Sequence, residues 1–161
     1  MSALVQVTIF LDFDGVLHPT WAKTPNLFEK AGLLEAAAAD LVNTEIVISS
    51  SWAAYKDLEQ LRHRFLPYPA LHRLILDKTR QLQRLAKEFE SMPEREAQCR
   101  AWLLENGRHP DHWLAIDDDA NNFKSTSNLI RTDGNVGLTD REVRALKELV
   151  GAYQARPLGS L

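Results

Sequence analysis

The sequence predicts a single α/β domain built on a parallel sheet, and two observations lead to this fold class. Short apolar segments typical of buried strands alternate along the chain with segments of helical spacing. The strand segments are almost continuously apolar, as expected where helices cover both faces of a sheet. We therefore expect a three-layer, Rossmann-like domain over residues 1–154, followed by a frayed tail over residues 155–161.

The strands are predicted from runs of apolar and β-branched residues. The first run covers residues 5–11 and ends at Asp12, and the second covers residues 45–48 and ends in three serines. Further strands are predicted over residues 72–76, 113–116 and 128–131.

The first helices are predicted from apolar residues three and four positions apart. This spacing is found over residues 28–41, 58–65 and 82–92. Pro67 is expected to end the second of these helices, because proline cannot continue a helix.

Two later helices are predicted from their start signals. Ser91-Met92-Pro93-Glu94 and Thr139-Asp140-Arg141-Glu142 both have the spacing of a capping box, in which a hydroxyl and a carboxylate satisfy free amide groups. The helix that begins near Ser91 is expected to end at Gly107.

The composition does not suggest a membrane or nucleic-acid protein. The formal net charge is −3, and the basic residues between Arg62 and Arg84 are expected on solvated helix faces rather than in a strong nucleic-acid patch. No apolar run approaches the ~20 residues that cross a bilayer. Cys99 is the single cysteine and the N-terminus lacks a basic segment, so we expect a reducing, cytoplasmic location.

Three of the predicted strands end in reactive polar residues. These are Asp12-Phe13-Asp14-Gly15, Ser49-Ser50-Ser51 and Asp117-Asp118-Asp119. Ligands of open parallel sheets bind at the carboxyl ends of strands, so neighbouring strands would bring these groups into one crevice. Packed carboxylates repel one another unless a cation joins them, and oxygen ligands favour a hard ion. The sequence therefore predicts a Mg²⁺ site at this edge of the sheet.

These strand ends resemble the motifs of the haloacid dehalogenase (HAD) superfamily. Residues 10–17, Phe-Leu-Asp-Phe-Asp-Gly-Val-Leu, resemble its first motif in the Asp-x-Asp-Gly form of phosphatases. Residues 46–50 resemble the second motif, an apolar strand that ends in a phosphate-binding Ser or Thr, and residues 114–118 resemble the acidic fourth motif. The third motif is a Lys or Arg near a helix start, for which Arg95 is the candidate and Lys78 the alternative.

A closer resemblance is to small bacterial HAD domains, including those attached to RNA-repair proteins. It rests on Asp-Gly-Val-Leu-His-Pro at residues 14–19, Ser-Ser-Trp at residues 50–52 and Gly-Leu-Thr at residues 137–139, together with Arg95. The segments after the first motif and after the third strand are short, so we expect a HAD-like domain with little or no cap.

The resemblance implies a role for each motif residue. Asp12 is the expected nucleophile and Asp14 the acid that protonates the leaving oxygen and then the base that activates water. Ser49 and Arg95 are expected to bind phosphate and to neutralise its charge. The motifs leave open whether Ser50 replaces Ser49 and whether Lys78 replaces Arg95. Four residues are expected beside the substrate: Gly15, His18, Ser50 and Lys78.

The same resemblance implies the ligands of the Mg²⁺ ion. The expected ligands are Asp12, the backbone carbonyl of Asp14, Asp117 and Asp118. Asn121 stands where the family often has a further acid, and Asp119 is expected to cap the turn that follows. Trp52 is expected to pack in the core rather than to take part in recognition.

Together these residues predict a Mg²⁺-dependent phosphomonoester hydrolase. A nearly uncapped site is open, so the expected partner is a phosphorylated substrate, either a small molecule such as a nucleotide or a polynucleotide end; the oligomeric state is left open. One alternative is a phosphoacceptor domain of the response-regulator kind, which the position of Asp12 on the first strand disfavours. Another is a non-catalytic binding domain with this fold, although every motif keeps chemically competent residues.

Overall fold

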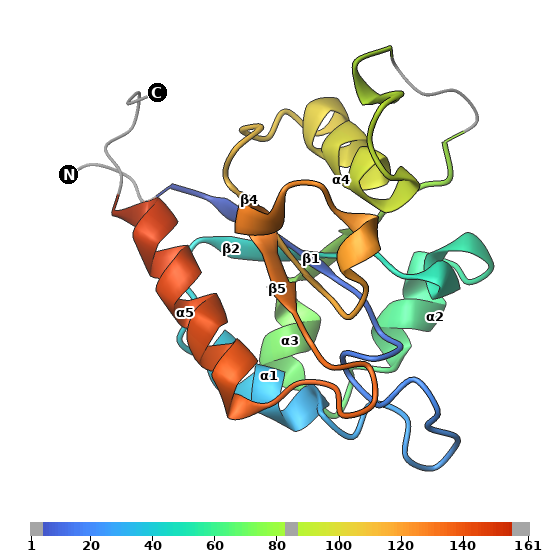
Figure 1. The fold of residues 1–161 in the computed structure, drawn as a ribbon. Helices are drawn as coiled ribbons and strands as arrows, with labels where there is room; N and C mark the ends of the chain where they lie inside the picture. The colour runs from blue at the N-terminus through green and yellow to red at the C-terminus, as the bar shows by residue number, and fades with distance from the viewer. Residues whose placement is uncertain (1–4, 83–86, 156–161) are drawn as a thin grey trace.

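The computed structural model describes residues 5–82 and 87–155, and its centre is a five-stranded parallel sheet (Figure 1). The strand order is β3-β2-β1-β4-β5, and every neighbouring pair is parallel. The strands are β1 (Val7–Leu11), β2 (Thr44–Ile48), β3 (Ile75–Lys78), β4 (Trp113–Asp117) and β5 (Leu129–Arg131).

Helices cover both faces of this sheet, which confirms the predicted three-layer α/β fold (Figure 1). The apolar core of one face includes side chains from α1 (Ala31–Ala38), α2 (Leu58–His63), α3 (Pro69–Leu74) and α5 (Asp140–Gln154). The core of the other face includes side chains from α4 (Glu94–Glu105). Four short 3₁₀ helices complete the description: η1 (Ser51–Ala54), η2 (Lys87–Phe89), η3 (Ala120–Asn122) and η4 (Thr126–Asn128).

The central strand β1 shows why the strand segments are so uniformly apolar. Ile9 and Leu11 are fully buried in the core on the side of α1 and α5, whereas Phe10 is fully buried on the side of α4. Phe10 meets the rings of Trp102 and Trp113 edge to face at 6.0 and 5.9 Å, a favourable arrangement for aromatic pairs. Because side chains alternate along a strand, the next residue on the α4 side is Asp12.

The strand order places a topological switch point at β1. The chain runs from β1 through β2 to β3 on one side, and β4 then pairs with the opposite edge of β1. Backbone bonds extend the ladder one residue beyond the strands: the amide of Asp12 donates to Ile116, and that of Ser49 donates to Leu11. Crevices at such switch points are where open α/β sheets bind ligands.

The third strand begins later than predicted, since residues 72–74 belong to α3 and the strand covers Ile75–Lys78. Pro69 occupies the first turn of α3, where a proline is favourable. The carboxylate of Glu35 on α1 accepts the amides of Ala70 and Leu71 at 2.9 and 2.8 Å. This cap from a distant helix starts a helix where the apolar pattern alone predicts a strand.

Two other helix predictions are wrong in their bounds. The helix predicted over residues 28–41 covers only Ala31–Ala38. Its start is later than predicted because Phe28 has a positive φ of 64° that a right-handed helix cannot contain. The helix predicted over residues 82–92 falls partly on residues 83–86, outside the described residues, and its remainder contains only the 3₁₀ turn η2.

The capping signals are also only partly confirmed. Pro93 precedes α4 in an extended conformation, so the helix begins at Glu94 and Ser91 does not cap it. Thr139 does occupy the cap position of α5, but its hydroxyl donates to the Glu142 carboxylate instead of accepting a backbone amide. A complete capping box is found at Asp57 and Gln60, before α2.

The described segments contain no separate cap domain, as predicted. Between β1 and β2 the chain forms a loop and α1, and between β3 and β4 its described part forms η2 and α4. No described helix is long and apolar enough to cross a membrane. Residues 156–161 of the predicted tail lie outside the described residues.

The buried carboxylate of Glu96 fastens α4 to the loop that follows β4. Glu96 is 2% exposed and accepts the backbone amides of Lys124 and Ser125 at 2.7 and 3.1 Å. It also pairs with the Arg100 guanidinium at 3.0 Å. These contacts set the position of the first turn of α4, in which Arg95 lies.

Glu96→Ala is expected to lower the free energy of unfolding by about 3 kcal/mol, because it leaves two amides and a guanidinium without their acceptor. Urea unfolding measures this change. Glu105→Ala, at the exposed end of the same helix, serves as the control and should change the value by less than about 0.5 kcal/mol. Equal effects of the two substitutions would contradict the fastening role of Glu96.

Candidate active site

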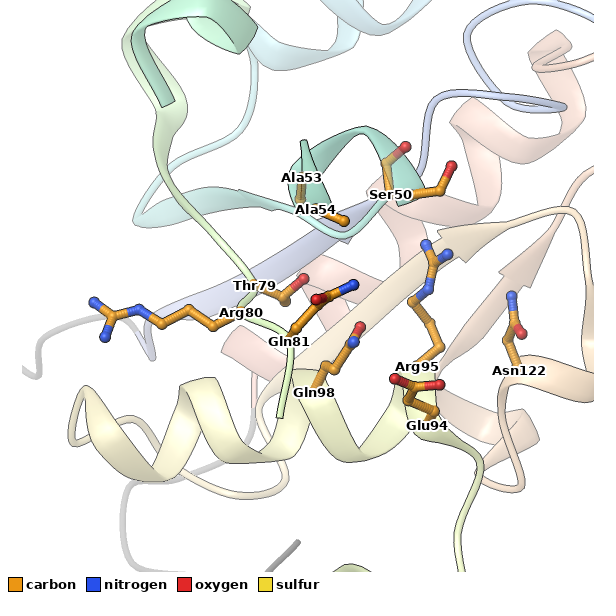
Figure 2. Close-up of a pocket in the computed structure, with 11 residues that line it drawn as sticks. Ser50, Ala53, Ala54, Thr79, Arg80, Gln81, Glu94, Arg95, Gln98 and Asn122 are labelled. Atoms are coloured by element: carbon orange, nitrogen blue, oxygen red, sulfur yellow. The ribbon is translucent and has the colours of Figure 1, made fainter. Parts of the chain in front are cut away.

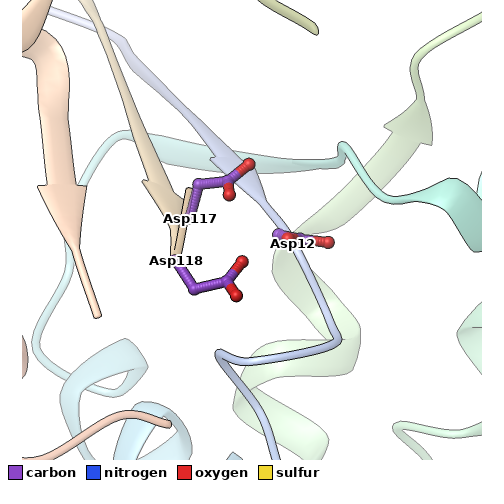
Figure 3. Close-up of side chains that lie close together, drawn as sticks. All are labelled: Asp12, Asp117 and Asp118. Atoms are coloured by element: carbon purple, nitrogen blue, oxygen red, sulfur yellow. The ribbon is translucent and has the colours of Figure 1, made fainter. Parts of the chain in front are cut away.

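Three carboxylates meet at the carboxyl ends of β1 and β4 (Figure 3). One oxygen from each of Asp12, Asp117 and Asp118 lies within 4.8 Å of the others. Asp12 and Asp117 are buried, and Asp118 is half-buried. The cluster is therefore mostly shielded from the water that would otherwise stabilise its negative charges.

Arg95 faces this cluster from the first turn of α4. Its Nη1 lies 3.6 Å from Oδ1 of Asp12 and 4.0 Å from Oδ2 of Asp117, and it donates a short hydrogen bond to the Ser49 carbonyl oxygen. The guanidinium thus joins the ends of β1, β2 and β4. The start of a helix is also a favourable place for an anion, because free amides and the helix dipole point toward it.

Burial perturbs the acid–base properties of the two deepest carboxylates. It is the largest cause that raises the pKa of Asp12 from its ordinary value of 3.8 to about 8; the charge of Asp117 adds to the increase, and Arg95 opposes it. Burial likewise raises the pKa of Asp117, against the opposing effects of the Asp119 amide and Arg95. Arg95 therefore offsets only part of the cost of ionising this cluster.

The donor set fits a hard divalent cation. All three candidate side-chain ligands are carboxylates, which are the ligands that Mg²⁺ prefers. A bound cation would favour the ionised form of each carboxylate and so reverse the effect of burial. Asp117 is held by the amide of Asp119 at 2.9 Å and by the side-chain amide of Asn122 at 3.3 Å, which orients it toward the cluster.

Asp14 lies outside this cluster of carboxylates and is held by two ring N–H groups. Its Oδ1 lies 2.7 Å from Nε2 of His18, and its Oδ2 accepts the indole N–H of Trp52 at 3.0 Å. Nδ1 of His18 accepts the backbone amide of Phe28, so a neutral His18 carries its hydrogen on Nε2 and donates to Asp14. The predicted substrate-binding residue His18 is itself fully buried.

Gly15 allows the chain to turn directly beneath Asp118. Its φ is +78°, and an added Cβ would lie 2.4 Å from Oδ2 of Asp118. Gly134, in the loop after β5, makes an equally close approach to the same oxygen, at 2.6 Å from an added Cβ. The hydroxyl of Thr132 donates to the Gly15 carbonyl at 2.6 Å. Two glycines therefore leave the space that the Asp118 carboxylate occupies.

The two serines of the second motif point in different directions. Oγ of Ser49 lies 3.5 Å from the buried Sγ of Cys99, beneath α4, and burial raises the pKa of that thiol to about 12. Ser50 instead lines a cavity together with Arg95 (Figure 2). The ammonium of Lys78 donates to the carbonyl oxygens of Ala53 and Lys56, and so holds the turn after Ser50.

The cavity beside Arg95 has a volume of about 290 Å³ and a largely polar lining. Figure 2 shows the Arg95 guanidinium pointing toward Ser50, with the amides of Gln81 and Gln98 beside them, whereas Arg80 points away. The cavity therefore opens next to the carboxylate cluster and offers hydrogen-bonding groups to a molecule placed there.

Three functional contacts were not predicted from the sequence. Trp52 was expected only to pack, yet its indole N–H binds Asp14. Asn122, rather than Asn121, reaches Asp117, while Asp119 caps η3 as predicted. Gly134 lies in a loop whose proximity to Asp118 depends on the position of β5. The Ser-Ser-Trp run is a sequence feature that could indicate a functional role for Trp52, whereas no local sequence feature indicates that Gly134 lies beside Asp118.

Gly15→Ala is expected to lower the free energy of unfolding by about 1–3 kcal/mol, because it strains the backbone and displaces Asp118. We also expect Mg²⁺ binding, measured by calorimetry, to weaken at least about ten-fold. Gly151→Ala in α5 is the matched control: nothing lies within 4 Å of its added Cβ, and it should stabilise the helix by about 0.5–1 kcal/mol. Unchanged Mg²⁺ affinity in Gly15→Ala would contradict this account of the turn.

The metal-free protein is expected to lose stability as the pH rises from about 5 to 8. The raised pKa of Asp12 means that the folded state binds this proton more tightly than the unfolded state, so deprotonation favours unfolding. Thermal melting in EDTA measures the loss, with about 2–4 °C in Tm for each kcal/mol. The Asp12→Asn variant should show a flatter profile, because its side chain carries no charge at any pH.

Added Mg²⁺ should oppose this trend, because the ion displaces the proton and binds the folded state. The stabilisation by Mg²⁺ is expected to be larger at pH 8 than at pH 5. If Tm falls equally with rising pH in the unchanged protein and in Asp12→Asn, both in EDTA, the raised pKa assigned to Asp12 is wrong.

Comparison with known families agrees with this geometry. A family model described as the HAD domain in Swiss Army Knife RNA repair proteins matches residues 8–143, most of the chain, including all three carboxylates of the cluster and Arg95. No curated protein and no solved structure matched the chain. The parallel sheet, the acidic strand ends and the extent of the match agree, and the family gives the chain a HAD-type, phosphoesterase-like function. The chain belongs to the family of HAD domains found in Swiss Army Knife RNA repair proteins.

Proposed function

We propose that this chain is a Mg²⁺-dependent phosphomonoesterase that works through an aspartyl-phosphate on Asp12. The observation that carries the proposal is the position of Asp12: it is buried at the switch point, next to two further carboxylates and 3.6 Å from the Arg95 guanidinium. A carboxylate in this setting is shielded from bulk water and lies beside groups that can bind an anion and a cation. This arrangement suits attack on a phosphoryl group.

In the first step, a carboxylate oxygen of Asp12 forms a bond to phosphorus while the bond to the leaving oxygen breaks. Asp14 gives its proton to that oxygen, so the product leaves as an alcohol. In the second step, Asp14 takes a proton from water, whose oxygen bonds to phosphorus as the bond to Asp12 breaks. Phosphate is released, and both carboxylates return to their starting forms.

Positive charge is needed because both the nucleophile and the substrate are anions. Asp12, Asp117 and Asp118 would hold Mg²⁺, which supplies charge neutralisation when bound. Arg95 would stabilise the equatorial phosphate oxygens from the other side, as cationic clamps do in phosphoryl transfer. We assign Ser50 rather than Ser49 to the phosphate, because Ser50 lines the cavity while the Ser49 hydroxyl contacts Cys99.

We further propose that the substrate is a nucleotide or the phosphorylated end of a polynucleotide. The cavity beside Arg95 is polar and opens to solvent, and the described residues form no cap domain that would enclose a small molecule. Neutral amides such as Gln81 and Gln98 can bind the sugar and base of such a substrate. The association of this family with RNA-repair proteins supports the same class.

Purified protein is expected to hydrolyse p-nitrophenyl phosphate with Mg²⁺ and to lose this activity in EDTA. Asp12→Asn should lower turnover at least about a thousand-fold, because the amide cannot act as the nucleophile. Asp57→Asn is the control: Asp57 caps α2 on the surface, and asparagine is an equally good cap. Released phosphate is measured in parallel from nucleotides and from RNA carrying 5′- or 3′-phosphates.

Two results would contradict the proposal. Retained turnover in Asp12→Asn would remove the nucleophile from the mechanism. Absence of phosphate release from every substrate, including the RNA ends, would show that the fold serves binding instead of hydrolysis.

A further inference from the structure

The carboxylate of Asp14 is held by groups from two other segments of the chain. His18 comes from the loop after the first motif, and Trp52 comes from η1, which follows β2. Each donates one N–H to a different oxygen of Asp14, so the plane of the carboxyl group is fixed from two directions. The Asp14 side chain is nevertheless 41% exposed, which leaves its outer face open to a substrate.

The side chain of Trp52, which carries the donating N–H, is held firmly by its neighbours. The Trp52 ring is 9% exposed and meets the rings of Phe13 and Phe28 edge to face, each at 5.6 Å. The Arg64 guanidinium lies 5.5 Å from the Trp52 ring, and the backbone amide of Trp52 donates to Oγ of Ser50. The indole N–H is therefore delivered from a packed side chain, whose orientation does not have to be set again in each turnover.

We infer that Trp52 is a positioning residue, which holds the Asp14 carboxyl group in the orientation for proton transfer to the leaving oxygen. The inference rests on the proposed phosphatase function. One lone-pair position on each Asp14 oxygen is occupied by an N–H donor, and the remaining position on each is free to carry the transferred proton. Without the indole N–H, the carboxyl group loses one of its two anchors and can turn away from the substrate.

This role has a consequence that depends on the leaving group. As the bond between phosphorus and the leaving oxygen breaks, its electron pair stays on that oxygen, which then takes the proton of Asp14. A p-nitrophenolate is stable as an anion and needs little help from this proton, whereas an unsubstituted phenolate is more basic and needs more. The two esters have nearly the same size, so a difference between them reports proton transfer rather than binding.

The test compares kcat/KM of Trp52→Phe for phenyl phosphate and p-nitrophenyl phosphate. Phenylalanine keeps an aromatic ring against Phe13 and Phe28 but removes the N–H. We expect the value for phenyl phosphate to fall about ten-fold more than that for p-nitrophenyl phosphate, a part of the full contribution of a general acid. The value of kcat/KM includes only the steps up to departure of the leaving group, so the later hydrolysis of the phospho-enzyme does not mask the effect.

Trp102→Phe is the matched control. Trp102 is also buried, and its indole N–H donates to a carboxylate oxygen of Asp77 at 2.8 Å. Its replacement removes the same kind of bond at a place where no leaving group is protonated. The ratio of kcat/KM for phenyl phosphate to kcat/KM for p-nitrophenyl phosphate should therefore stay within about two-fold of its value in the unchanged protein.

A second measurement does not depend on catalysis. In a ¹H–¹⁵N spectrum, the indole resonance that is missing from Trp52→Phe belongs to Trp52, and it should shift in Asp14→Asn but not in Asp77→Asn. An unshifted resonance in Asp14→Asn would overturn the contact. Equal losses for both substrates in Trp52→Phe would overturn the positioning role, whereas an unmodified protein that cleaves neither ester and releases no phosphate from nucleotides or RNA ends would overturn the phosphatase function itself.

Discussion

The burial of two carboxylates at neighbouring strand ends is the constraint on which this site depends. Parallel pairing of β1 and β4 brings Asp12 and Asp117 to the same edge of the sheet, and burial raises the pKa of both. Arg95 compensates for part of this charge, and Glu96 next to it fixes the helix turn from which it reaches. The paired strand ends thus form a site that favours a bound cation, and neither strand would form it alone.

The parts of the site that lie on single strands could be predicted from the sequence. The apolar run before Asp12 and the one before Asp117 identify buried parallel strands, and the ends of such strands are adjacent by the geometry of the sheet. Arg95 could be placed because it follows a helix start, even though the predicted start at Ser91 was too early. In these cases the position depends on local pattern and on one general rule of topology.

The parts that depend on contacts between distant segments could not be predicted. Trp52 and Asp14 are 38 positions apart, and their hydrogen bond requires the actual path of the turn after β2. In the same turn, Ser50 lines the cavity and its hydroxyl accepts the backbone amide of Trp52. The Lys78 ammonium holds this turn, whereas the motifs offered Lys78 only as an alternative phosphate ligand to Arg95. The start of the third strand was missed because Glu35, on another helix, caps α3.

Two loops beside the carboxylates are joined to each other, and the described residues form no separate domain over the site. The loop after the first motif is bonded to the loop after β5: the amide of Thr20 donates to the Gly134 carbonyl at 2.7 Å, and that of Leu138 donates to the Val16 carbonyl at 2.8 Å. Gly137 permits this contact, since an added Cβ would lie 2.9 Å from the Val16 oxygen. These backbone hydrogen bonds tie the two loops together on this side of the site. The site therefore stays open at the polar cavity beside Arg95 and at the outer face of Asp14, although Asp12 itself is buried.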